Sequence, residues 1–209
     1  MGLFSPDSKF MRVMSRIGDL MLLNLAFLVS CVPLFTIGAA TTALYTVVFR
    51  FDTPREGGVV PDFFRAFLQN FRRSTGLWLI LLFCIAATGF DAWLFSSFTG
   101  PMRWMCVLFA LLLFVALLTA VMGFPLLSQF ENTVGSTLKN AMSLSVGYLP
   151  RSGLLLLLWL FPFGLLLKDM YSFLYTGFLW VALYFSAVAY LGARLLKKVF
   201  APYRKEEEI

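Results

Sequence analysis

Long apolar segments recur along this chain of 209 residues, and they constrain its fold more than any other feature. Hydrophobic side chains make up 60% of the residues and charged side chains only 13%, which is far from the composition of a soluble domain. A soluble fold of this size could not bury so much apolar surface. The sequence therefore predicts an integral membrane protein.

We expect an all-α fold, a polytopic transmembrane helical bundle, because an α-helix satisfies its own backbone hydrogen bonds inside lipid. About six membrane segments are expected, near residues 18–35, 36–49, 76–98, 102–124, 152–167 and 171–195. The second is short for a span, so it is tilted, partly re-entrant or packed against the first as a hairpin.

These segments predict one membrane domain over residues 1–209, because no stretch is left that could form a separate soluble domain. Its expected parts are an interfacial N-terminal helix (1–17), a helical hairpin (18–49), an interfacial helix with two spans (62–124), a second such unit (126–195) and a cytoplasmic tail (196–209) that ends in a disordered acidic stretch.

The stretch from Asp62 to Trp78 begins as an amphipathic helix and continues into an apolar run. A basic, aromatic-faced helix of this kind is typical of the membrane interface. A second amphipathic pattern lies at Thr137–Met142. The residues expected to contact lipid or a partner on the cytoplasmic side are Phe63, Arg65, Phe67, Phe71, Arg72, Arg73, Lys139 and Arg151.

Basic residues indicate the orientation of the chain. With six crossings and a cytoplasmic N-terminus, Arg103 and Lys168 are the only two of the 17 Lys and Arg residues on the outer side. This bias favours cytoplasmic placement of both termini. A five-span alternative, in which Thr36–Phe49 does not cross, leaves one of the basic clusters outside.

Polar residues inside apolar segments are costly and therefore mark candidate functional positions. The three candidates are Asp19, Asn24 and Asp91. Asp19 is expected to cap a helix or pair with Arg12 or Arg16, Asn24 to hydrogen-bond between helices, and Asp91 to pair with Arg103 or Lys168 or to contact a substrate or ion. A run of small residues predicts a close contact between helices; it consists of Gly38, Ala39, Ala40, Thr41, Thr42 and Ala43.

The residue types present argue against an enzyme. The chain has no histidine, which removes the commonest general base and metal ligand. Its three cysteines lie in apolar runs, where they are expected to be buried small hydrophobic residues. We therefore expect no catalytic residues, no metal and no cofactor. We also expect no nucleic-acid binding, because the basic residues border membrane segments.

Three stretches resemble signature motifs of the YesL family: PLFTIGAATTALY (Pro33–Tyr45), DFFRAFLQNFRRSTGLWL (Asp62–Leu79) and TLKNAMSLSVGY (Thr137–Tyr148). The opening FMRVMSRIGDLMLLN (Phe10–Asn24) is similar as well. This family consists of small integral membrane proteins of Gram-positive bacteria with a domain of unknown function. Its members are often encoded beside carbohydrate ABC importers, extracellular solute-binding proteins and sensor kinases.

The resemblance implies a non-catalytic accessory subunit of a carbohydrate ABC uptake or sugar-sensing system in the bacterial cytoplasmic membrane. The expected partners are membrane lipid and an ABC permease subunit or a sensor kinase, and a homo-oligomer is also compatible with these features. Two alternatives stay open from the sequence. One is a small oligomeric transporter or channel that uses Asp91, and the other is an assembly or lipid-interacting factor.

Overall fold

The computed structural model describes residues 9–51 and 58–207, and this part of the chain is helical without strands. The all-α prediction is therefore confirmed. The elements are α1 (Lys9–Ser30), η1 (Leu34–Thr36), α2 (Ile37–Phe49), α3 (Val59–Ser96), η2 (Gly100–Trp104), α4 (Met105–Gln129), α5 (Val134–Gly147), α6 (Leu149–Lys168), α7 (Met170–Tyr175), α8 (Gly177–Leu179), the π-helical turn η3 (Trp180–Tyr184) and α9 (Phe185–Glu207).

Five helices in the described residues are long and apolar enough to cross a membrane. They span Phe10–Ser30, Val59–Ser96, Gly100–Gln129, Leu149–Lys168 and Gly177–Ala201. The apolar segment Leu34–Phe49 is shorter, as the sequence predicted. The chain is thus a multi-pass membrane protein with a short helical segment after its first span.

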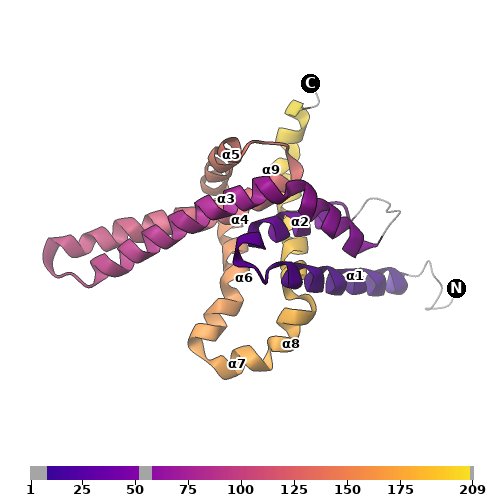
Figure 1. Ribbon diagram of the computed structural model, residues 1–209, viewed down its shortest axis with the longest axis horizontal. Helices are drawn as coiled ribbons and strands as arrows, with labels where there is room; N and C mark the ends of the chain where they lie inside the picture. Colours follow the sequence, from indigo (N-terminus) through magenta and orange to yellow (C-terminus); the bar gives the residue numbers. More distant parts are fainter. Residues whose placement is uncertain (1–8, 52–57, 208–209) are drawn as a thin grey trace.

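The short helix α2 forms the centre of the fold. Every residue from Gly38 to Phe49 is buried. α2 contacts α1, α3, α4 and α9, and Figure 1 shows it enclosed among these helices. A segment of this apolarity that is covered by protein does not face lipid, so it can return the chain from the end of α1 to the start of α3 although it is short for a span.

Two helical arms extend from this centre (Figure 1). One is the antiparallel pair α3–α4, which projects to the left of the view with η2 at its tip. The other is formed by α6 and the segment from α8 to α9, and it projects downward with α7 at its tip. The arms diverge, so the molecule is not a bundle of parallel helices.

Two predicted interfacial helices continue without a break into the spans that follow them. α1 runs without a break from Lys9 to Ser30, and α3 runs from Val59 to Ser96. Neither helix contains a proline beyond its first turn, and extending a helix costs less than starting a new one. The 38 residues of α3 correspond to about 57 Å at roughly 1.5 Å per residue, which exceeds a hydrocarbon core of about 30 Å.

The segment expected as a cytoplasmic tail is helical as far as Glu207, where α9 ends, so the acidic stretch expected to be disordered is helical up to that residue. Leu196, Val199 and Phe200 are buried and follow helical spacing. The ring of Phe200 lies 6.1 Å from that of Phe49 and 5.8 Å from that of Phe130. The end of α9 is therefore part of the core around α2.

Candidate functional site

The small-residue face of α2 packs against α3. A Cβ at Gly38 would lie 2.5 Å from the Cβ of Trp78 and 2.6 Å from the backbone oxygen of Ser74. Only glycine permits this approach of the two helices. Gly38 of the predicted small-residue run thus contacts α3 closely, and all six residues from Gly38 to Ala43 are buried.

A hydrogen bond joins the same two helices one turn further along α2. The Ser74 hydroxyl donates to the Thr42 hydroxyl at 2.9 Å, and both side chains are fully buried. The hydroxyls of Thr41 and Thr46 donate to backbone oxygens one turn earlier in α2, at 2.7 and 2.8 Å. These threonines therefore hold helices together or bond within their own helix.

Asn24 lies at the contact between α1 and the π-helical turn of the last span, and its side chain is fully buried. Its amide nitrogen donates to the backbone oxygens of Trp180 at 2.9 Å and Val181 at 2.6 Å. Its oxygen accepts from the backbone N–H of Ser186 at 3.0 Å. A π-helical turn disturbs regular helical bonding, and a polar side chain from a neighbouring helix can supply the missing partners.

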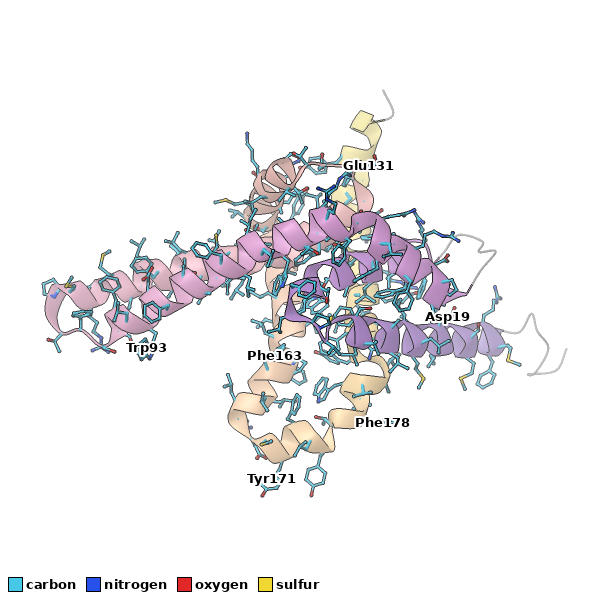
Figure 2. The ribbon with its side chains drawn as sticks, in the orientation of Figure 1. Asp19, Trp93, Glu131, Phe163, Tyr171 and Phe178 are labelled. Atoms are coloured by element: carbon cyan, nitrogen blue, oxygen red, sulfur yellow. The ribbon has the colours of Figure 1, made fainter. Side chains whose placement is uncertain are left out.

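The three polar candidates are not brought together. Asp19 is half-buried on α1 (Figure 2), five residues before Asn24. Asp91 is half-buried on α3, two residues before Trp93, which Figure 2 places on the outer part of the α3–α4 arm. Among the described residues Asp91 forms no ion pair with Arg103, at the tip of the same arm, or with Lys168, at the end of α6 in the other arm.

The residues predicted to face lipid or a partner on the cytoplasmic side differ in their exposure. Arg65, Arg72, Arg73 and Lys139 are exposed, whereas Arg151 is half-buried and its guanidinium lies 5.4 Å from the centre of the Tyr148 ring. Phe67 and Phe71 are half-buried, with ring centres 5.5 Å apart.

Phe63 does not contact lipid or a partner, which corrects its predicted role. Its side chain is 0% exposed and belongs to the core around α2. The apolar face of this part of α3 is covered by the chain at Phe63 but only partly at its other aromatic residues. Leu68, by contrast, is 72% exposed.

Sequence reasoning missed a cluster of arginine and aromatic side chains between α1 and α9. The Arg16 guanidinium lies 4.8 Å from the centre of the Phe51 ring and 6.0 Å from that of Tyr190. Arg194 lies 4.6 Å from the Tyr190 ring and donates to its hydroxyl. Cation–π contacts of this kind stabilise two positive charges near one another. The helical spacing of Tyr190 and Arg194 was the available signal.

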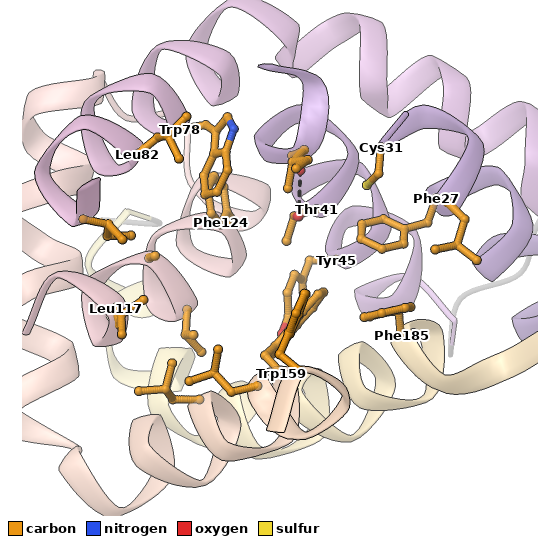
Figure 3. A pocket seen from close by; sticks show the side chains of 18 residues that line it. Phe27, Cys31, Thr41, Tyr45, Trp78, Leu82, Leu117, Phe124, Trp159 and Phe185 are labelled. Carbon is orange, nitrogen blue, oxygen red and sulfur yellow. Dashed lines mark hydrogen bonds between the residues drawn. The ribbon is translucent and has the colours of Figure 1, made fainter. Parts of the chain in front are cut away.

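Sequence reasoning also missed a cavity of about 390 Å³ between the two arms (Figure 3). Leu82, Leu117 and Phe124 line it from the α3–α4 arm, and Trp159 lines it from α6. Tyr45 of α2 lies at its centre in this view. No single stretch of sequence signals the cavity, because its walls come from helices far apart in the chain.

The described polar residues mainly hold the helices together. Within residues 9–51 and 58–207, no group of three or more His, Cys, Asp or Glu residues gathers to hold a metal ion. Asn24, Thr42 and Ser74 are engaged in hydrogen bonds between helices. The cavity walls are apolar. The arrangement can bind apolar groups and hold helices in register.

Comparison with known proteins gives one match. No curated protein sequence matches the chain, and no solved structure matches it. The matched segment begins at Leu20 in α1, includes all of α2 and ends within α3. It therefore carries Asn24, Gly38 and Ser74, the residues that organise the centre of the fold. Over residues 20–92 the chain is similar to the family described as "Protein of unknown function, DUF624".

Proposed function

We propose that this chain is a non-catalytic accessory subunit of a membrane complex for carbohydrate ABC uptake or sugar sensing. The observation that carries the non-catalytic part is that Asn24, Thr42 and Ser74 are fully buried and bonded to neighbouring helices. The link to carbohydrate systems rests on the resemblance to the YesL family, a DUF624 family, in the stretches from Pro33, Asp62 and Thr137.

The proposed setting is the bacterial cytoplasmic membrane, with both termini in the cytoplasm. Two facts support it. Arg103 and Lys168, the residues expected outside, lie at the tips of the two arms. Arg65, Arg72 and Arg73 lie in the first half of α3, away from its tip. This separation follows the positive-inside rule.

The proposed partner is an ABC permease subunit or a sensor kinase, docked on the basic cytoplasmic surface. We define this surface by the exposed residues Arg65, Arg72, Arg73 and Lys139. α3 and α5 contact one another, so the surface is carried by two packed helices. Rigid positioning of charges favours specific recognition of an acidic partner.

The small transporter or channel has less support. A pathway for a hydrophilic substrate needs polar groups that face a common passage. Asn24 is fully engaged in the α1–η3 contact, and Asp91 lies on the α3–α4 arm. The cavity between the arms is lined by apolar groups.

The test is affinity purification of the tagged chain from its native membrane in mild detergent, followed by quantitative mass spectrometry. Recovery of an ABC permease subunit or a sensor kinase in a fixed ratio is the expected result. Recovery of the chain alone, or only as a homo-oligomer, would overturn the accessory role and favour the transporter hypothesis.

A further inference from the structure

The cavity between the arms has a buried floor and an exposed rim. Tyr45 is 1% exposed and Leu156 is 6% exposed at its floor, whereas Leu160 is 40% and Phe163 is 56% exposed at its rim. Phe163, labelled on α6 in Figure 2, lines the cavity. The cavity is therefore open at one side, where a membrane protein meets hydrocarbon.

Most hydrogen-bonding side chains among the described walls of the cavity are engaged within the protein, and the Tyr45 hydroxyl keeps its own O–H as a donor. The Thr41 hydroxyl donates to the backbone oxygen of Ile37 at 2.7 Å, as the dashed line in Figure 3 marks. The indole N–H of Trp78 donates to the backbone oxygen of Leu34 at 2.8 Å.

The remaining polar groups are Tyr45, Trp159 and Cys31. The Trp159 indole donates to the Tyr45 hydroxyl at 3.3 Å. The Cys31 thiol is a weak donor that behaves as a small hydrophobic group. The other walls are hydrocarbon side chains. A polar ligand would lose its hydration here and gain few bonds in return, chiefly to the Tyr45 hydroxyl, so the cavity favours an apolar occupant.

The size of the cavity fits a flexible hydrocarbon chain as its occupant. An apolar cavity of roughly 150 Å³ accepts one benzene molecule, and ligand pockets of roughly 300–1,000 Å³ are typical. The volume of about 390 Å³ therefore holds considerably more than one aromatic ring. Aromatic rings from several helices, including Phe27, Phe124 and Trp159, form part of its walls beside aliphatic side chains.

We infer that this cavity binds one acyl chain of a membrane phospholipid, which enters between the arms while its headgroup stays at the membrane interface. A phospholipid is the occupant because the helices that form the opening cross the membrane by length and composition, and acyl chains surround such helices. This inference concerns the protein by itself and does not depend on the proposed accessory role.

The test is native mass spectrometry of the purified full chain, released from mild detergent with its endogenous lipid. The variant Ala120→Phe fills the cavity, because Ala120 is a 9% exposed wall residue on α4. The matched control Ala110→Phe adds the same ring to an exposed position of α4. Wild type and the control should carry one phospholipid per chain, and Ala120→Phe should lose it.

Equal lipid retention by the two variants would overturn the inference. The inference would also be overturned if Ala120→Phe disrupted a dimer or a complex with another protein, because the occupant of the cavity would then be a protein surface. These outcomes differ from failure of the accessory role, which is read from the partners recovered from the native membrane.

A second measurement uses the wild-type chain, so it does not depend on whether Ala120→Phe folds. A phospholipid with a photoreactive group on its acyl chain is added in detergent, and adducts are mapped by peptide mass spectrometry. Adducts at Leu82, Leu160 and Phe163 that excess unlabelled phospholipid suppresses are expected. Adducts that resist competition and are spread over outward residues such as Leu111, which is 58% exposed, would contradict the inference.

Discussion

Gly38 and Trp78 set the distance between α2 and α3, because a Cβ at position 38 would lie 2.5 Å from the Cβ of Trp78. The same Cβ would lie 2.6 Å from the backbone oxygen of Ser74. Since a backbone atom cannot move aside as a side-chain tip can, any larger residue at position 38 must separate the helices. α2 is the centre of the fold, so this contact affects the whole molecule.

We predict that Gly38→Ala lowers the free energy of unfolding by about 1–3 kcal/mol, the usual range for overpacking a tight site. Thermal unfolding in detergent measures the effect. The control is Gly153→Ala in α6, where a Cβ would meet nothing within 4 Å. Its midpoint should stay the same or rise slightly, because alanine favours the helix. Equal midpoints for both variants would disprove the close contact.

Replacing Asn24 with leucine should loosen the π-helical turn. Asn24→Leu removes the bonds to the backbone of Trp180, Val181 and Ser186. Hydrogen bonds between membrane helices are worth about 0.6 kcal/mol on average, so a loss of about 2 kcal/mol is expected. Hydrogen exchange should become faster at residues 180–186.

The matched control for this variant is Asn70→Leu. The Asn70 amide donates to the backbone oxygen of Ala66 in its own helix at 3.1 Å. Its replacement should leave the exchange of residues 180–186 unchanged. Protection of these residues in Asn24→Leu at the wild-type level would show that Asn24 does not hold the turn.

Phe63 and Leu68 should respond differently to truncation, although both are apolar residues of the same amphipathic stretch. Phe63→Ala removes a fully buried ring and should cost about 3–5 kcal/mol of unfolding free energy. Leu68→Ala alters a side chain that is 72% exposed and should change stability by less than about 0.5 kcal/mol. Chemical denaturation in detergent compares them. A small effect of Phe63→Ala would restore its predicted role in lipid or partner contact.

The hydrogen bond between Ser74 and Thr42 predicts a measurable coupling. In a double-mutant cycle with Ser74→Ala and Thr42→Val, the coupling energy should be about 0.6 kcal/mol. A cycle of Ser74→Ala with Thr88→Val serves as the control, because Thr88 donates to the backbone oxygen of Cys84 in its own helix. Coupling energies that do not differ between the two cycles would rule out a specific bond.

The proposed orientation predicts which positions are reached from outside the cell. In a chain whose native cysteines are replaced by alanine, Thr99→Cys and Tyr175→Cys place a thiol at the tips of the two arms. Glu131→Cys places one between α4 and α5, at the opposite end of the α3–α4 arm (Figure 2). A membrane-impermeant thiol reagent added to intact cells should label the first two and not the third. The reverse pattern would invert the topology.

Helix content could be predicted from the sequence because apolar runs and helical spacing are local signals. The same signals explain why α2 was recognised as short and as a close-packing segment. These signals did not show whether an interfacial helix ends before the span that follows it or continues into that span, since nothing in the residues of α1 or α3 marks such an end. They also did not show that Leu196, Val199 and Phe200 continue the core beyond the last span.

The divergence of the arms and the cavity could not be predicted. They depend on contacts between residues far apart in the chain, such as the bonds from Asn24 to Ser186 and from Trp159 to Tyr45. Periodicity shows that a helix has an apolar face, but it does not show whether lipid or protein covers that face. Phe63 and Leu68 differ for this reason.

The central claim is that the chain acts by holding a partner on its basic cytoplasmic surface. Its most direct test compares partner recovery from the native membrane for two charge-reversed variants. One carries Arg65→Glu and Arg72→Glu on the exposed part of α3, and the other carries Arg103→Glu at the tip of the α3–α4 arm. The account predicts that the first variant loses the permease subunit or sensor kinase and the second retains it at the wild-type ratio. Equal recovery by both variants, or no partner with the wild-type chain, would contradict the account.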